Sequence, residues 1–194
     1  MRLLRSRVCL AAPAVSYDVK RSKFAAINLK DGDSLLSVMP AEEGADLLMM
    51  TRKGMCIRFA LDDVPEMGRV SAGVKGMKVD EDDQVILACP IAVSDQILLF
   101  TERGYGKRLM SAMFDAQGRA GKGVKCVYFN KSGSTGTYVA AAARITNTRA
   151  FTVLQHGGLL TPLSSDDLPC QDLADKGKPI VMAVLDDVVE ELIL

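Results

Sequence analysis

The sequence lacks tryptophan, has one histidine and few aromatic residues (5%), and contains no C-x-x-C pair. Zinc and thiol-redox sites usually need such a pair, so both kinds of site are disfavoured. His156 has no nucleophile beside it in its turn, which disfavours a Ser–His–Asp or Cys–His constellation. We therefore expect no catalytic residue, cofactor or metal in this chain, and no activity of this chain alone.

Long apolar runs are also missing, so we expect no membrane span. The first 15 residues begin with basic residues, but their apolar stretch is short and is interrupted by Pro13, unlike a secretory signal. A hydrophobic content of 48% is typical of a folded protein. The five cysteines are odd in number and widely spaced, which favours reduced, structural thiols in a cytoplasmic protein.

The net charge is zero, but the charges are unevenly distributed. Residues 1–78 carry +4, residues 79–131 carry 0, and residues 132–194 carry −4. A basic part beside an acidic end favours a polyanion partner for one part of the surface and not for the other. Ordinary solvated surface is the alternative, because an imbalance of four charges does not exclude it.

An internal repeat is the strongest feature of the chain. A shift of 50 residues aligns Thr51–Val79 with Thr101–Phe129 without a gap, matching Arg58 to Arg108 and Gly68-Arg69 to Gly118-Arg119. A further copy follows at a shift of 54, where Pro162, Leu173 and Pro179 replace Arg108, Arg119 and Lys125. A partial copy precedes them. We therefore expect one repeat domain divided at residues 1–26, 27–78, 79–131 and 132–194, the last being degenerate with a tail.

Each repeat is predicted to form short strands. Residues 46–50 and 55–59 flank a four-residue turn that ends in Gly54, and residues 96–100 and 105–109 flank the same turn ending in Gly104. Such turns indicate hairpins, because glycine readily adopts positive φ. A helical turn is expected next, over residues 60–67, 111–117 and 164–171, and a glycine- and arginine-bearing loop follows it. Another strand, over residues 73–79 or 123–129, an acidic turn and a last strand such as residues 84–92 complete the repeat. The acidic turns, residues 30–33 and 80–83, are interpreted as turn chemistry rather than a metal site. The fold class is all-β, with four-stranded, propeller-like blades.

The segments "TRKGMCIRF", "MGRVSAGVKGMKV", "ERGYGKR" and "QGRAGKGVK" resemble the C-terminal domain of the A subunit of bacterial type IIA topoisomerases, DNA gyrase or topoisomerase IV. The resemblance covers nearly all of residues 13–185. It implies a β-pinwheel, a disc whose blades exchange strands, here a partial disc of about three and a fraction blades. It further implies wrapping of double-stranded DNA around the rim, near the nucleoid. The implied partners are the ATPase B subunit, together with the remainder of the A subunit. ATP-dependent catalysis would lie elsewhere in that enzyme.

The residues themselves support this interpretation. Glycine lets the backbone approach a ligand closely, and Arg and Lys neutralise phosphates, so repeating such a loop around a curved edge predicts bending of DNA without reading its sequence. The expected DNA-binding residues are Arg58, Arg69, Lys75, Lys78, Lys107, Arg108, Arg119, Lys122 and Lys125, with Lys20, Arg21 and Lys23 in the partial repeat.

Two alternatives stay open. Gyrase carries a box Q-(R/K)-R-G-G-(R/K)-G, from which "QGRAGKG" (residues 117–123) departs at Gly118 and Ala120, so topoisomerase IV is as well supported. A propeller-type protein-interaction module without DNA binding is the alternative function, favoured by the zero net charge and the acidic last repeat. Open blade edges at the ends of a partial disc would allow dimerisation.

Overall fold

The computed structural model describes residues 2–5 by their backbone, and residues 8–29, 34–40, 44–184 and 186–194 in full. These residues form three four-stranded sheets and one three-stranded sheet, all antiparallel within their hairpins. The first sheet has the order β3-β1-β2-β6, the second β10-β5-β4-β7, the third β11-β8-β9-β14 and the fourth β13-β12-β15. The strands are β1 (Arg2–Arg5), β2 (Val8–Ala11), β3 (Leu35–Met39), β4 (Asp46–Thr51), β5 (Met55–Ala60), β6 (Val74–Lys75), β7 (Val85–Ile91), β8 (Gln96–Thr101), β9 (Tyr105–Met110), β10 (Val124–Lys125), β11 (Val139–Ile145), β12 (Ala150–Gln155), β13 (Leu160–Ser164), β14 (Lys178–Pro179) and β15 (Val189–Ile193).

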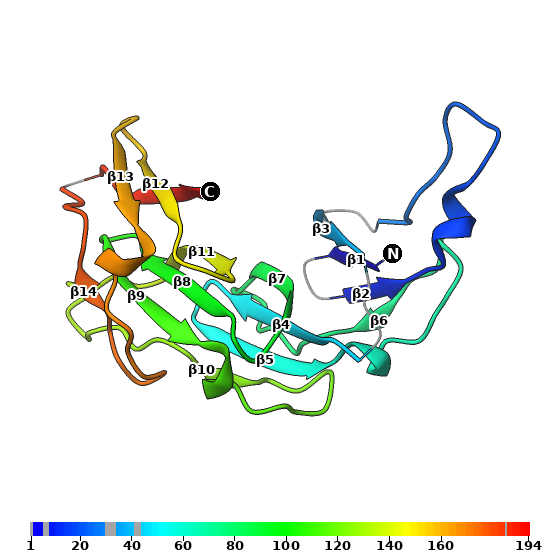
Figure 1. Cartoon of the computed structure of the whole chain (residues 1–194), viewed down its shortest axis with the longest axis horizontal. Coiled ribbons are helices and arrows are strands. Elements are labelled where there is room, and N and C mark those ends of the chain that lie inside the picture. Colours follow the sequence, from blue (N-terminus) through cyan, green and yellow to red (C-terminus); the bar gives the residue numbers. More distant parts are fainter. Residues whose placement is uncertain (1, 6–7, 30–33, 41–43, 185) are drawn as a thin grey trace.

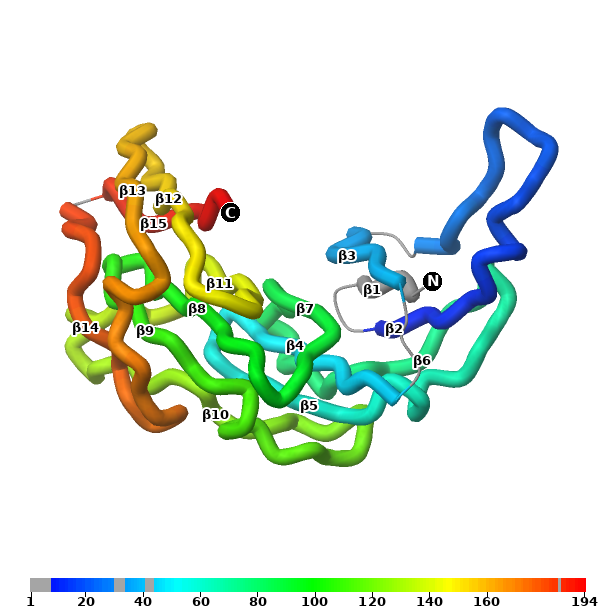
Figure 2. Tube along the Cα trace, in the orientation of Figure 1, coloured from blue at the N-terminus to red at the C-terminus, as the bar shows by residue number. Residues whose placement is uncertain are grey.

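The four sheets are the blades of an open arc. Strands β3, β7, β11 and β15 lie on its concave side, where consecutive members contact one another, while β6, β10 and β14 lie on its convex side (Figure 2). We call this convex edge, with the loops that carry β6, β10 and β14, the rim. The first and last blades form the two tips of the arc, and they lie apart (Figure 1).

The second, third and fourth blades are each built on a hairpin whose turn ends in glycine. The amide of Gly54 donates to the Thr51 carbonyl at 2.9 Å, and Gly104 donates to Thr101 at 3.0 Å. Both glycines have positive φ (77° and 76°), as the turn predicts. Strands β4 and β8 are almost wholly buried, because each of the two middle blades packs both faces against its neighbours. One hydrophobic cluster lies between each pair of adjacent blades.

The outer strand of each of the first three blades comes from the following repeat. Val74–Lys75 pairs with β2, Val124–Lys125 pairs with β5, and Lys178–Pro179 pairs with β9. We call this arrangement strand donation. As a result, each of the first three sheets combines strands from two consecutive sequence repeats, whose boundaries follow residues 26, 78 and 131.

The predicted fold class is confirmed, with differences in detail. The hairpin strands and β7 lie where the sequence places them, and short 3-10 helices occupy the predicted helical turns. These helices are η2 (Leu61–Asp63), η3 (Ser111–Met113) and η4 (Ser165–Asp167), while a further 3-10 helix, η1 (Ala14–Tyr17), was not predicted. The strands expected over residues 73–79 and 123–129 shrink to two residues each, because only a short edge of the preceding hairpin remains for them to pair with.

The incomplete blade is another difference. The first blade, expected to be a fraction, has four strands, whereas the described residues give the last blade three. Strand donation explains this, because β6 from the second repeat completes the first blade and nothing described completes the last. The acidic turn at residues 80–83 is confirmed by the hydrogen bond from Asp83 N to the Asp80 carbonyl (3.1 Å), whereas residues 30–33 lie outside the described residues.

Strand donation depends on glycines that precede the donated strands. Gly123 has a φ of 76°, and a Cβ added there would overlap the backbone carbonyl of Cys56 in the accepting hairpin. Gly118, in the same loop, would meet no atom within 4 Å. The Gly123→Ala variant should therefore lose about 2–5 kcal/mol of unfolding free energy, from the left-handed backbone and the overlap.

The matched variant Gly118→Ala should change the unfolding free energy by less than about 1 kcal/mol. Urea denaturation of both variants would measure the difference. Equal stability of the two would contradict the role assigned to Gly123.

Candidate nucleic-acid interface

Arg58 and Arg108 occupy matching positions in two repeats. Arg58 joins the second blade to the third, and Arg108 joins the third blade to the fourth. Arg58 Nε lies 2.6 Å from Asp46 Oδ2, and its Nη1 donates to the carbonyl of Phe114 beside η3 (3.2 Å). Arg108 Nε donates to the carbonyl of Leu168 beside η4 (2.9 Å), and its Nη1 lies 3.1 Å from Asp166 Oδ1. Their guanidinium groups are thus largely buried in contacts within the protein, and these contacts account for their repetition.

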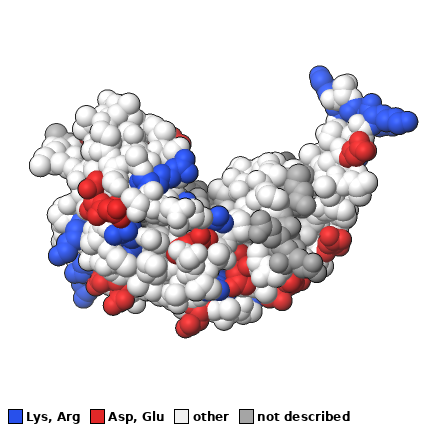
Figure 3. All heavy atoms as spheres, in the orientation of Figure 1, with Lys and Arg blue, Asp and Glu red and all other residues white. Residues whose placement is uncertain are grey.

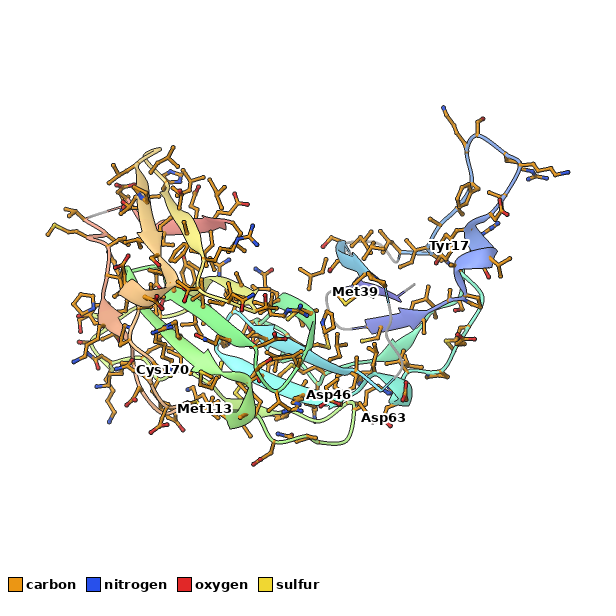
Figure 4. The ribbon with its side chains drawn as sticks, viewed as in Figure 1. Tyr17, Met39, Asp46, Asp63, Met113 and Cys170 are labelled. Carbon is orange, nitrogen blue, oxygen red and sulfur yellow. The ribbon has the colours of Figure 1, made fainter. Side chains whose placement is uncertain are left out.

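Arg69 and Arg119 lie in rim loops, and each contacts the 3-10 helix of the preceding blade. We call the place where such a 3-10 helix follows its hairpin the corner of the blade. Arg69 Nη1 donates to the Ser16 carbonyl at 2.7 Å, in η1, while its guanidinium lies 5.2 Å from the centre of the Phe24 ring. Arg119 Nε donates to the Asp63 carbonyl at 3.2 Å, in η2. Figure 4 shows these corners along the outer edge of the arc, marked by Tyr17, Asp63, Met113 and Cys170. Both arginines remain partly exposed.

Lys107 is wholly buried, so its side chain cannot reach a DNA phosphate from this position. Its Nζ donates to the carbonyls of Asp172 and Asp175, both at 2.8 Å, and thereby holds the loop that precedes β14. Burial lowers the pKa of Lys107 to about 8, because the charged amine loses its hydration. The burial of Lys107 contradicts the expectation that it contacts DNA. Lys107 instead supports strand donation, because it holds the loop that precedes the donated strand β14.

The exposed lysines of the rim come together across two repeats. The Lys78 amide donates to the Gly121 carbonyl at 2.8 Å, and the Ala120 amide donates to the Gly76 carbonyl at 2.9 Å, so the two rim loops lie side by side. Arg119 Nη1 also donates to the Lys75 carbonyl at 2.5 Å. Lys75, Lys78 and Lys122 are all exposed, and with Arg119 they form one cluster of four cations, which we call the basic cluster.

Acidic residues partly balance the basic cluster. Lys122 Nζ lies 3.5 Å from Asp80 Oδ1, and Lys78 and Lys122 line a small hollow together with Asp80 and Asp83. Both members of the Lys122–Asp80 pair are more than half exposed, so the pair contributes little to stability. Its lysine therefore stays available to a stronger anion.

The rim continues beyond the basic cluster toward the last blade. Lys125 is exposed on β10, with its Nζ 5.1 Å from the centre of the Tyr128 ring. Lys176 and Lys178 are exposed at the equivalent place beside and within β14. Neither was among the expected DNA-binding residues. The shift of 54 places Lys176 on Lys122, but it places Pro179 on Lys125 and so gives Lys178 no basic counterpart.

Lys20, Arg21 and Lys23 are exposed on a loop, residues 18–29, that projects from the first blade. Figure 3 shows basic side chains at the tip of this loop and along the left part of the convex edge, with acidic side chains between them. The candidate interface is therefore a discontinuous basic band along the rim rather than a uniformly positive face.

The described residues contain no group of three or more His, Cys, Asp or Glu placed to hold a metal ion. The five cysteines are free, and three of them are buried in the core. None of the described helices is long and apolar enough to cross a bilayer.

The contacts of Arg108 predict a loss of stability on truncation. Arg108→Ala removes charge-assisted hydrogen bonds to Leu168, Gln96 and Asp166, and should lower the unfolding free energy by about 1.5–3 kcal/mol. Lys125→Ala, on the exposed rim, should change it by no more than about 0.5 kcal/mol. Thermal or urea denaturation would test both, and an unchanged stability of Arg108→Ala would rule out the inter-blade role.

The buried Lys107 predicts a dependence of stability on pH. Its pKa is about 8 in the folded chain, below the ordinary value of 10.5. Between these values the unfolded chain binds a proton that the folded chain has lost, so the unfolding free energy should rise with pH. We expect the difference in unfolding free energy between the wild type and Lys107→Met to grow in favour of the wild type from pH 8 to pH 10. A flat difference across this range would contradict the assignment.

Sequence comparison finds a matching family and related proteins for this chain. The sequence profile of the family described as "DNA gyrase C-terminal domain, beta-propeller" matches residues 25–42, 45–88 and 95–134. The chain is 34% identical to the A subunit of DNA gyrase from Kosmotoga olearia over 177 residues, which is 89% of the chain and 21% of that protein. It is 31% identical to the A subunit of DNA gyrase from Mycolicibacterium smegmatis over 147 residues, 74% of the chain and 17% of that protein. The chain thus spans about a fifth of these relatives.

Solved structures share the fold. The crystal structure of the C-terminal domain of DNA topoisomerase IV superposes with a TM-score of 0.91 at 19% sequence identity, over 98% of this chain and 60% of the other. The DNA gyrase A C-terminal domain superposes with a TM-score of 0.82 at 18% identity, over the whole of this chain and 65% of the other.

Proposed function

Because this chain belongs to the family of DNA gyrase C-terminal domains, we propose that it binds double-stranded DNA along its rim and bends it. The basic cluster of Lys75, Lys78, Arg119 and Lys122 is the observation that carries the proposal, since two repeats bring these cations together on an exposed, convex edge. The loops that supply them, residues 68–78 and 118–128, hold three basic residues each and no acidic one.

The band extends the basic cluster in both directions. Lys125, Lys176 and Lys178 continue it toward the last blade, while Lys20, Arg21 and Lys23 lie at the first blade. A duplex that contacts several of these groups must follow the curvature of the arc, at an elastic cost on the order of 1–6 kcal/mol. Phosphate contacts spread over several blades offset that cost, and they do not discriminate between sequences.

Arg58, Arg108 and Lys107 support this surface from within. The contacts of the two arginines hold consecutive blades in register, and Lys107 holds the loop that precedes β14. Arg69 and Arg119 combine both roles, because each fixes a rim loop while remaining partly exposed beside the lysines.

The proposal extends to the larger enzyme. As part of the A subunit of a type IIA topoisomerase, gyrase or topoisomerase IV, the chain would present bent DNA for ATP-dependent strand passage in the cytoplasm, at the nucleoid. The cleavage tyrosine and the ATPase would be supplied by other parts of that assembly, in which the B subunit would be a partner.

Binding to a duplex of about 40 base pairs across a salt series tests the proposal. The affinity should fall steeply with salt concentration, since each phosphate contact contributes about 0.9 to the slope of log K against log salt. In the double variant Lys75→Ala/Lys125→Ala, binding should weaken and the slope should fall by about 1.8, for two lost contacts.

A matched control removes one charge away from the rim. Arg149 is exposed in the turn between β11 and β12, so Arg149→Ala should leave the slope unchanged, whereas Lys125→Ala alone should lower it by about 0.9. If these two single variants weaken binding equally, the rim assignment is wrong. If the wild type does not bind at low salt, the DNA-binding proposal is overturned in favour of a protein-interaction module, which the acidic last repeat would suit.

A further inference from the structure

Two cysteine side chains meet where the donated strand β10 joins its acceptor hairpin. Cys56 lies on β5 in register with Val124, and its Sγ donates to the Val124 carbonyl at 3.5 Å. Cys126 directly follows β10, and its amide donates to the Gly54 carbonyl at 2.8 Å. In an antiparallel ladder, such diagonal neighbours lie on the same face of the sheet. Both cysteines are 0% exposed and belong to the hydrophobic cluster between the second and third blades.

The neighbouring blades show how close strand donation brings these two positions. In the first blade, Cys9 and Gly76 occupy the places of the two cysteines, and a Cβ added at Gly76 would lie 2.7 Å from Cys9 Sγ. In the third blade, the places belong to Gly106 and Ile180, and a Cβ added at Gly106 would lie 3.0 Å from Ile180 Cγ1. Two cysteines at these places are therefore within reach of a bond between their sulfur atoms. Of the three blades, the second has cysteine at both.

The closed blade protects this pair of thiols. A hydrogen bond with Cys126 and burial raise the pKa of the Cys56 thiol, and the nearby charge of Lys107 opposes the shift. A protonated, buried thiol reacts slowly with oxidants. Strand β10 is only two residues long, and both residues are exposed at the rim, so we expect it to open locally more often than the hairpin beneath it. Each such opening exposes the thiols to solvent.

We propose that Cys56 and Cys126 are an oxidation site, at which a disulfide forms and locks β10 onto its acceptor hairpin. The oxidant is a low-molecular-weight disulfide. One cysteine gives up its proton, attacks that disulfide and displaces a thiolate, which takes up the proton. The second cysteine then attacks the mixed disulfide, forms the protein disulfide and releases the other small thiol in the same way. The two cysteines thus lose two electrons and two protons, and the small disulfide is reduced to two thiols.

The lock acts on the middle of the rim and is reversible. Strand β10 carries Lys125, and Lys122 lies just before it, so the disulfide fixes the segment that supplies two exposed cations of the rim. The first and third donated strands lack a cysteine pair, so one blade responds and its neighbours do not. A thiol reductant releases the strand, as in the transient disulfides of reducing compartments. Formation of the bond involves no DNA, so the proposal stands or falls independently of DNA binding.

Peptide mapping by mass spectrometry, after incubation with oxidised glutathione, tests the pairing. The experiment uses Cys170→Ser, because Cys170 is exposed and would react with the oxidant first. After an acid quench, alkylation and digestion, two peptides should be joined through Cys56 and Cys126, with the loss of two hydrogens. Adding Cys126→Ala should abolish the link, and this small side chain is expected to fit because the first blade has Gly76 at that place. Adding Cys9→Ala, which removes a buried thiol of the first blade, is the matched control and should leave the link intact.

Thermal unfolding tests the lock. The disulfide closes a loop of about 70 residues, so oxidised Cys170→Ser should unfold at a temperature roughly 5–10 °C above that of the reduced protein. Dithiothreitol should remove this gain, and Cys170→Ser/Cys126→Ala should show none. A link that is absent after oxidation of the folded protein, or that forms only in urea, would overturn the oxidation site. A link that forms without raising the unfolding temperature would overturn the lock.

Discussion

Strand donation is the constraint on which the rest of the structure depends. Each of the first three hairpins accepts its outer strand from the following repeat, so none of these blades is complete within its own repeat. The glycine before each donated strand lies against the accepting backbone, and the buried Lys107 holds the loop before β14. These contacts place β6, β10 and β14 on the convex edge, and they thereby decide which side chains are available to a ligand.

The same constraint separates the roles of the basic residues. Arg58 and Arg108 repeat because each joins its blade to the next, and their partners are carbonyls beside equivalent 3-10 helices. The lysines of the rim do not join one blade to the next, and their side chains are exposed to solvent. Repetition of a residue is thus evidence of a shared environment, and only the surrounding contacts tell whether that environment is internal or faces a partner.

Much of the fold could be predicted from the sequence, because hairpins are local. Strands at 46–51 and 55–60 follow from short apolar runs on either side of a glycine-ended turn, and the 50-residue period gives the number of hairpins. Strand donation could not be derived from pattern alone, since a two-residue strand has no periodicity. The burial of Lys107 was also hidden, because a lysine is ordinarily exposed and its three carbonyl partners lie more than 60 residues away.

The direction of strand donation has a consequence for synthesis on the ribosome. The first hairpin, ending at Ala11, has to wait for Val74 and Lys75 to emerge before its sheet is complete, and the second, ending at Ala60, waits for Val124 and Lys125. Folding therefore trails translation by one repeat along the whole chain. During that interval each nascent hairpin presents an unpaired edge, which is the form most exposed to pairing with a neighbouring nascent chain.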